Sequence, residues 1–159
     1  QEIFKRAVQG MAQASAAVMA KCGVTAADID LVVPHQANLR IIEAVVNKAG
    51  VPMDKVMLTV SRYGNMSAAT VPVALAEALE EGRVKPGALI LMPAFGGGLT
   101  VCAHLVRWGE RVTPLGQSDA ELPPAKASAL DMVNRIRDRK TGAAERSKAG
   151  FTAPNFVGS

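Results

Sequence analysis

The chain has 159 residues, 49% hydrophobic and 20% charged, a balance that supports a buried core and excludes a chain disordered by composition. The net charge of +4 is spread evenly, without a dense basic stretch, so nucleic acid is not the first partner that we expect. The apolar runs fall short of the roughly 18 residues of a membrane span, and two cysteines with two distant histidines exclude a disulfide framework and disfavour a zinc site.

Helices alternate with short apolar strands along the first part of the chain. The predicted helices, which carry apolar residues at helical spacing, are 1–22, 39–49 and 67–79. The predicted strands, which are rich in Val, Ile and Leu, are 29–33, 56–60, 88–92 and 99–108. Asn38 and Gly50 have the positions of an N-cap and a C-terminal stop for the second helix. Asn65 or Ser67 can cap the third helix.

This alternation indicates βαβ units and therefore an α/β fold with a layered sheet. The last two strands are separated only by a short loop with glycines at 96–98. A connection that short favours an antiparallel pair, so we expect a mixed sheet covered by helices.

The composition changes after Trp108. Residues 110–159 are rich in Pro, Gly, Ser and Ala, and within them 126–140 have the spacing of an amphipathic helix. We therefore divide the chain into a folded domain over 1–109 and an irregular extension over 110–159. The chain opens within a helix, without an initiator Met or an N-cap, so we expect it to be cut from a longer chain. The absence of a secretory signal favours a cytoplasmic protein.

Three segments that follow predicted strands are candidate functional sites, because open α/β sheets bind ligands at the carboxyl ends of their strands. His35 follows a predicted strand, where a neutral imidazole can donate to an oxyanion or accept a proton; the alternative is a loop histidine bonded to backbone. Asn65 offers uncharged donors and an acceptor, although a turn with an N-cap explains it fully. The glycines at 96–98 can present N–H groups to an anion or a thioester carbonyl, or form a tight turn.

Neither cysteine has the surroundings of a nucleophile. Cys22 lies at the C-terminal end of the first predicted helix, where the helix dipole disfavours a thiolate. Cys102 and His104 share one face of the last predicted strand, but nothing in the sequence orients the imidazole. We therefore expect both thiols to be packed side chains.

The three places together resemble one family. The chain is similar to the C-terminal half of the β-ketoacyl-(acyl carrier protein) synthases III, the initiating condensing enzymes of bacterial type II fatty acid synthesis. The resemblance covers residues 1 to about 108. The segments that carry it read VPHQANLR over 33–40, YGNMSAA over 63–69 and AFGGGLT over 94–100.

The resemblance implies a thiolase-like fold, in which two similar halves stack helix and sheet layers, and usually a homodimer. It implies a decarboxylative Claisen condensation between an acyl-CoA and a malonyl-carrier protein, with a Cys-His-Asn triad, no metal and no cofactor beyond the CoA and phosphopantetheine thioesters themselves. His35 and Asn65 match two triad members, which bind the malonyl thioester carbonyl and stabilise the enolate. The nucleophilic Cys belongs to the N-terminal half and neither Cys22 nor Cys102 matches it, so the chain needs that half as a partner.

Five further residues match positions of the family. The N–H of Gly97 matches an oxyanion-hole donor, and Phe95 matches a residue beside the nucleophile that assists decarboxylation. Asn38 matches a contact to the pantetheine arm. Arg40 and Lys48 match the basic helix that receives the acidic carrier protein.

Two alternatives stay open. A related thiolase-superfamily acyltransferase, forming polyketide, quinolone or ester products, is compatible with His35 and Asn65, because acyl choice lies largely in the other half. A non-catalytic half could serve dimerisation or carrier-protein docking, although retention of both residues argues against it. The family usually ends near Trp108, so the resemblance assigns no role to residues 110–159.

Overall fold

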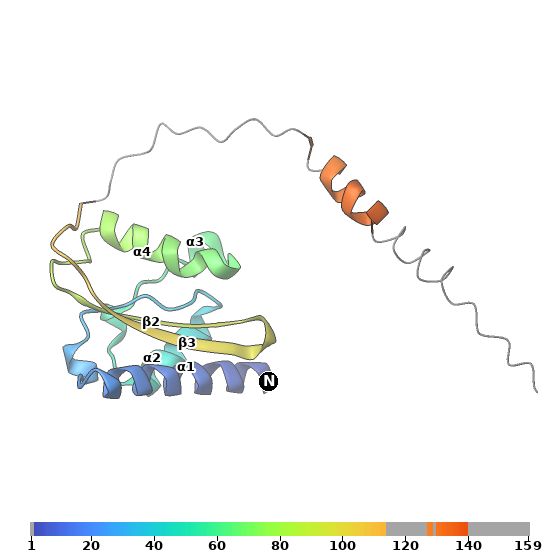
Figure 1. The fold of residues 1–159 in the computed structure, drawn as a ribbon. Coiled ribbons are helices and arrows are strands. Elements are labelled where there is room, and N and C mark those ends of the chain that lie inside the picture. Colours follow the sequence, from blue (N-terminus) through green and yellow to red (C-terminus); the bar gives the residue numbers. More distant parts are fainter. Residues whose placement is uncertain (1, 114–126, 129, 140–159) are drawn as a thin grey trace, which may run out of the picture. The chain divides into compact units, whose positions relative to one another are not determined.

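The computed structural model describes residues 2–113, 127–128 and 130–139 (Figure 1). The helices of the first part are α1 (Glu2–Lys21), α2 (Leu39–Ala49), α3 (Val60–Tyr63) and α4 (Thr70–Glu80). The strands are β1 (Leu31–Val32), β2 (Leu89–Gly96) and β3 (Thr100–Arg107). Two of the short 3-10 turns matter for the site, η3 (Ser67–Ala69) and η4 (Gly97–Leu99).

The three strands form one mixed sheet in the order β1-β2-β3. β1 runs parallel to β2. β2 and β3 run antiparallel, from Leu89 opposite Arg107 to Gly96 opposite Thr100. The expected mixed sheet with an antiparallel final pair is confirmed. In Figure 1, α1 and α2 lie on one side of the sheet and α3 and α4 on the other.

The side chains of β1 alternate between the two faces of the sheet. Val32 packs with Ile42 and Val46 of α2, and Leu31 packs with Ala74 of α4 in a separate cluster. Each of these side chains is at most 1% exposed. A strand that is buried on both faces needs a continuous apolar run rather than alternation, which explains the composition of this segment.

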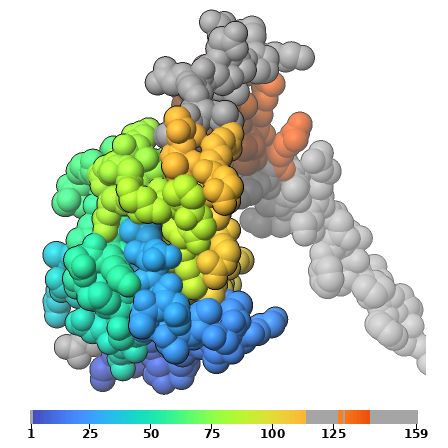
Figure 2. Space-filling model, turned by 90° about the vertical axis from the view of Figure 1, so that its left-hand side faces the viewer, coloured from blue at the N-terminus to red at the C-terminus, as the bar shows by residue number. Residues whose placement is uncertain are grey.

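Hydrogen bonds tie the starts of β1 and β2 together. The N–H of Asp30 donates to the carbonyl of Leu89 at 3.0 Å, and the Asp30 carboxylate accepts the N–H of Leu89 at 2.7 Å. In Figure 2 the segment that leads into β1 (blue) lies against the one that leads into β2 (yellow-green). This pairing fixes the register of the two strands, and therefore also the place where their carboxyl ends meet.

The predicted ends of the second helix are confirmed. Oδ1 of Asn38 accepts the N–H of Ile41 at 3.0 Å, and Gly50 has a left-handed backbone with φ of 73°. The predicted cap of the third helix is wrong. The N-cap position of α4 is Ala69, which has no side-chain cap, because the η3 turn intervenes between Asn65 and the helix.

The predicted strand over 56–60 is also wrong. Val56 makes only an isolated parallel bridge to Val32, and the chain then enters α3. The reason is a side chain from elsewhere: Oε1 of Gln36 accepts the backbone N–H groups of Thr59 at 2.8 Å and Val60 at 3.0 Å. These groups are therefore satisfied without a ladder partner, and the backbone is free to coil.

The chain divides into two compact units, Gln1–Gly116 and Gln117–Ser159. In the second, residues 130–139 are helical, within the range 126–140 for which the sequence predicts a helix. Oγ of Ser128 accepts the N–H of Asp131 at 3.1 Å, and the Asp131 carboxylate accepts the Ser128 hydroxyl at 2.7 Å. Most of the predicted irregular extension lies outside the described residues. No helix in the described part of the chain is long and apolar enough to cross a membrane.

Candidate functional site

His35 lies where the backbone beyond β1 continues alongside β2. Its N–H donates to the carbonyl of Pro93 at 2.8 Å, so the loop keeps the spacing of the parallel ladder. The side chain is buried, with 8% of its surface exposed. Desolvation penalises the charged form and lowers the pKa of the His35 imidazole from its ordinary value of 6.5. The ring is therefore neutral at neutral pH.

Two side chains hold the His35 ring. Nδ1 is hydrogen-bonded to Oγ1 of Thr70, the first residue of α4, at 2.6 Å. The ring of Phe95 stands at 88° to the imidazole with 5.3 Å between centroids, an edge-to-face contact. Within the described part of the chain, Nε2 makes no hydrogen bond, so it is the ring nitrogen available to a ligand.

Asn65 lies in the turn between α3 and η3. Its Oδ1 accepts the N–H of Ser67 at 3.0 Å, which closes an Asx turn. Gly64 has φ of 64° and Ser67 has φ of 54°, so the backbone bends sharply on both sides of Asn65. The amide nitrogen of Asn65 makes no hydrogen bond to the described residues, and its donors remain free for a ligand.

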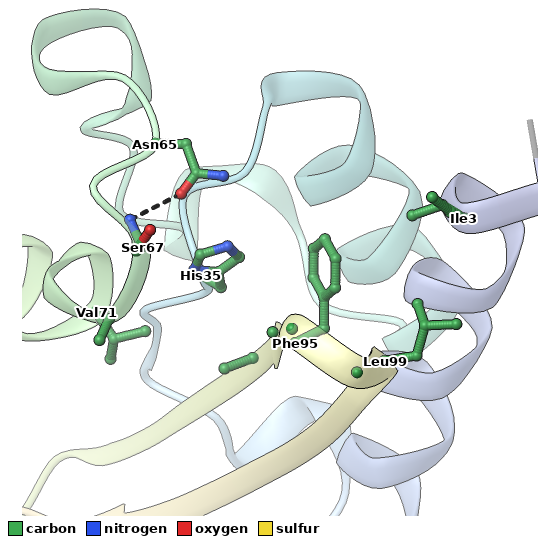
Figure 3. A pocket seen from close by; sticks show the side chains of 12 residues that line it. Ile3, His35, Asn65, Ser67, Val71, Phe95 and Leu99 are labelled. Atoms are coloured by element: carbon green, nitrogen blue, oxygen red, sulfur yellow. Dashed lines mark hydrogen bonds between the residues drawn. The ribbon is translucent and has the colours of Figure 1, made fainter. Parts of the chain in front are cut away.

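His35, Asn65 and Phe95 line one cavity of about 610 Å³, and Figure 3 shows their side chains around it. The glycine turn after β2 forms another part of the wall, where Gly98 has φ of 76°. The rest of the wall is mostly apolar and includes Ile3, Ala68, Val71, Ala94 and Leu99. The structure therefore brings together His35, Asn65, Phe95 and Gly97, which the sequence analysis selected from separate segments.

The other selected residues lie around α2, outside that cavity. Asn38 uses its Oδ1 as the helix cap, which leaves its amide NH₂ uncommitted. Arg40 is exposed and its guanidinium lies 5.9 Å from the centroid of the Phe4 ring. Lys48 is exposed and lines a second hollow of about 710 Å³ between α1 and α2.

Gln36 is a residue that the sequence analysis missed. It is fully buried, and its Nε2 donates to the carbonyls of Pro34 at 2.9 Å and Met57 at 3.1 Å. Oε1 accepts the N–H groups of Thr59 and Val60, so both donor and both acceptor positions of this amide are used. The sequence indicates only that a Gln follows the candidate histidine. It does not indicate which distant backbone groups the Gln36 amide binds.

The expectation that both cysteines are packed is wrong. Cys22 and Cys102 are free and exposed. Cys22 lies in the turn after the end of α1, and Cys102 lies with exposed His104 on β3, an outer strand of the sheet. Neither thiol lines the cavity around His35. Among the described residues, no three His, Cys, Asp or Glu side chains are grouped to hold a metal ion.

Comparison with known proteins identifies relatives of this chain. Residues 19–108 match the family model described as 3-oxoacyl-[acyl-carrier-protein (ACP)] synthase III C terminal. The beta-ketoacyl-[acyl-carrier-protein] synthase III 2 of Vibrio cholerae serotype O1 is 54% identical over 134 residues, which are 84% of this chain and 37% of the relative. The 134 aligned residues are more than the 109 residues of the predicted folded domain, so the similarity to this relative continues beyond residue 109.

Solved structures give the same result. The 3-oxoacyl-[acyl-carrier-protein] synthase III of Aquifex aeolicus VF5 matches with a TM-score of 0.66 and 50% identity over 67% of this chain and 35% of that one. The priming beta-ketosynthase of the R1128 polyketide pathway matches with a TM-score of 0.65 and 34% identity over 69% of this chain and 33% of that one. The chain therefore spans about one third of the length of these relatives.

Proposed function

Because this chain belongs to the family of 3-oxoacyl-(acyl carrier protein) synthase III C-terminal parts, we propose that it supplies the His/Asn half of a condensing enzyme of fatty acid synthesis. The solved relatives confirm the expected thiolase-like fold of helices on a mixed sheet. The complete enzyme condenses an acyl-CoA primer with a malonyl-carrier protein. It needs an N-terminal half that holds the nucleophilic Cys, and we propose that it works as a cytoplasmic homodimer.

One observation carries this proposal: two neutral side chains with free polar groups line the same mostly apolar cavity. Nε2 of His35 and Nδ2 of Asn65 have no hydrogen bonds within the described residues. Charge that develops on a thioester oxygen is stabilised most by fixed dipoles in a site that excludes water. A buried neutral imidazole and an amide suit this task, because they carry no charge that must itself be desolvated.

The reaction has two covalent stages. The Cys thiol of the other half attacks the acyl-CoA carbonyl, so that an acyl–sulfur bond forms to Cys and the bond to CoA breaks, releasing CoA with the thiol proton. The malonyl thioester then binds with its carbonyl oxygen toward His35 and Asn65. Its bond to the carboxylate breaks, CO₂ leaves and the electron pair forms the enolate.

The enolate carbon next attacks the acyl-enzyme carbonyl. A carbon–carbon bond forms, the Cys thiolate leaves, and the product is a 3-oxoacyl-carrier protein. We propose that the N–H of Gly97, together with the N–H of the nucleophilic Cys, holds the oxyanion of this step. Phe95 stands edge-on to His35 at the same cavity, where an apolar ring favours loss of the charged carboxylate.

The face around the start of α2 suits the carrier protein. The Asn38 amide oxygen caps α2, so its NH₂ group is free to donate to the pantetheine arm. Arg40 and Lys48 are exposed on α2 and can meet the acidic surface of the carrier protein.

The test is decarboxylation of a malonyl thioester by the chain combined with its N-terminal half. We expect His35→Ala and Asn65→Ala each to lower the rate by 10²-fold or more, roughly the loss of one oxyanion donor, whereas His104→Ala leaves it unchanged. Unchanged rates in both site variants would overturn the assignment. Intact mass after incubation with short acyl-CoAs is the companion measurement: acylation of Cys22 or Cys102 in the chain alone would contradict a nucleophile in the other half.

The priming ketosynthase among the relatives gives the alternative a specific basis. Its name places it in a polyketide biosynthetic pathway. Product analysis with the reconstituted enzyme tests the alternative, by comparing turnover with the carrier protein of a fatty acid pathway and with that of a polyketide pathway.

A further inference from the structure

The hydroxyl of Thr70 makes two short contacts but has one proton. Oγ1 lies 2.6 Å from Nδ1 of His35 and 2.9 Å from the carbonyl oxygen of Ser67. A carbonyl oxygen can only accept, and a neutral imidazole nitrogen donates only if it carries the ring proton. Two electron-rich atoms at such distances need a proton between them.

Only one arrangement places a proton in both contacts. The Thr70 hydroxyl gives its proton to the carbonyl of Ser67, and the proton between Oγ1 and Nδ1 must then come from His35. We propose that Thr70 is the positioning residue that holds His35 in the Nδ1–H tautomer, so that Nε2 faces the cavity as an acceptor when no ligand is bound. This inference deepens the proposed function and rests on it for its catalytic meaning.

Burial protects this arrangement. Thr70 is 0% exposed and His35 is 8% exposed, so water does not compete for either contact. The edge-to-face contact with Phe95 also opposes rotation of the imidazole. The tautomer is therefore set by protein groups and not by solvent.

The same contacts provide a way to change the tautomer. The carbonyl of Ser67 also accepts the backbone N–H of Thr70, so it stays bonded if the hydroxyl turns away. The turned hydroxyl keeps its own proton and donates it to Nδ1. For this to happen the ring takes up one proton at Nε2 from water in the empty cavity and releases its Nδ1 proton to water, after which Nε2–H can donate to a thioester oxygen. Thr70 thus lets His35 act as an acceptor in the empty site and as a donor in the occupied one, without a net charge on the ring.

Nitrogen-15 NMR of the two histidine rings tests the proposal on the full chain without substrate. Two-bond nitrogen–proton couplings distinguish the Nδ1–H from the Nε2–H form of a neutral imidazole. We expect the His35 ring in the Nδ1–H form at pH 7.5, whereas exposed His104 shows the Nε2–H form that free imidazoles prefer. His104→Gln assigns the two sets of signals.

Variants of Thr70 complete the test. Thr70→Ser keeps the hydroxyl and should keep the Nδ1–H form, whereas Thr70→Val, of almost the same shape, should move His35 largely to Nε2–H. Thr59→Val is the matched control, because Thr59 is also fully buried but its Oγ1 has no hydrogen-bond partner in the described part of the chain. It should leave the His35 signals unchanged.

An Nε2–H form in the unsubstituted chain, or an unchanged Nδ1–H form in Thr70→Val, would overturn the proposal. Should Thr70→Val fail to fold, the tautomer of the unsubstituted chain and of Thr70→Ser still decides it. The NMR measurement uses no thioester substrate. The tautomer of His35 can therefore be confirmed even if the proposed condensing function is wrong, and the function can be confirmed even if the tautomer is wrong.

Discussion

The amide oxygen of Gln36 accepts the backbone N–H of Thr59 at 2.8 Å, and this bond joins the loop that carries His35 to the loop before α3, the helix that leads into the Asn65 turn. The loops are far apart in sequence and no strand ladder connects them at this point. This buried side chain therefore fixes the loop that carries His35 against the start of α3, the helix that leads to Asn65.

Gln36→Ala should destabilise the chain strongly. It leaves two carbonyls and two N–H groups without their partner, at about 1 kcal/mol or more each, so the expected loss is about 4 kcal/mol. Urea denaturation followed by circular dichroism measures it. Gln13→Ala, on the exposed face of α1, is the control and should change stability by no more than about 0.5 kcal/mol. Equal effects of the two variants would show that the Gln36 bonds do not stabilise the fold.

The stability should depend on pH through His35. Its pKa is lowered by burial in the folded state, so the unfolded chain binds the proton more readily. Stability is therefore complete above the ordinary pKa of 6.5 and falls as the pH drops below it toward the folded pKa. Denaturation midpoints between pH 7.5 and 5.5 should show a smaller decline in His35→Gln than in His104→Gln. Parallel curves for these two variants would contradict the assignment.

Gly10 of α1 lies against Val101 of β3. A Cβ at this position would lie 2.8 Å from Cγ1 of Val101, a stiff β-branched side chain. Gly10→Ala should therefore destabilise by about 1 kcal/mol in spite of its better helix propensity. Combined with Val101→Ala, the same change should stabilise by about 0.5 kcal/mol. A double-mutant cycle from denaturation measures the coupling, and additive effects would contradict the close contact.

Arg40 and Lys48 should govern use of the carrier protein. Reversing both to Glu should raise KM for malonyl-carrier protein roughly tenfold and weaken its dependence on salt, with kcat little changed. The measurement uses the complete enzyme. Lys21→Glu, at the far end of α1, is the control. An unchanged KM in the double variant would remove α2 as the docking helix.

The chain alone should self-associate. Leu99 in η4 is 39% exposed, and Val101 is 38% exposed on β3, which is paired on one side only. Sedimentation velocity should show species larger than a monomer whose proportion rises with concentration, and Val101→Lys should reduce them. A monomer at all concentrations, with a cooperative thermal unfolding transition, would show that the exposed apolar side chains of Leu99 and Val101 do not drive association.

The sequence predicts the helices and the antiparallel pair because their signals are local. Asn38 and Gly50 mark the ends of α2 within their own segment, and the glycine loop leaves few ways to connect β2 and β3. The family motifs predict that one site contains His35, Asn65 and Gly97. The predicted secondary structure by itself does not indicate that His35 and Asn65 lie at the same cavity.

Two of the failures share a physical cause, which is a hydrogen-bond partner from a distant part of the chain. The strand over 56–60 does not form because Gln36 binds its N–H groups, and no local pattern reports a bond across that separation. Thr70 was read only as part of a helix, although its hydroxyl contacts His35. The thiol of Cys102 was expected to be packed, but β3 lies at the edge of this sheet.

The bond from His35 to Pro93 and the ring contact with Phe95 attach the site to alternate residues of β2. Removing or adding one residue in this strand before Phe95 would turn that ring to the opposite face, because side chains alternate with a period of two. The Lys85–Ala88 turn at the other end of β2 has no such constraint from the cavity. Length changes in a library of variants should therefore be tolerated at that turn and rejected within the strand.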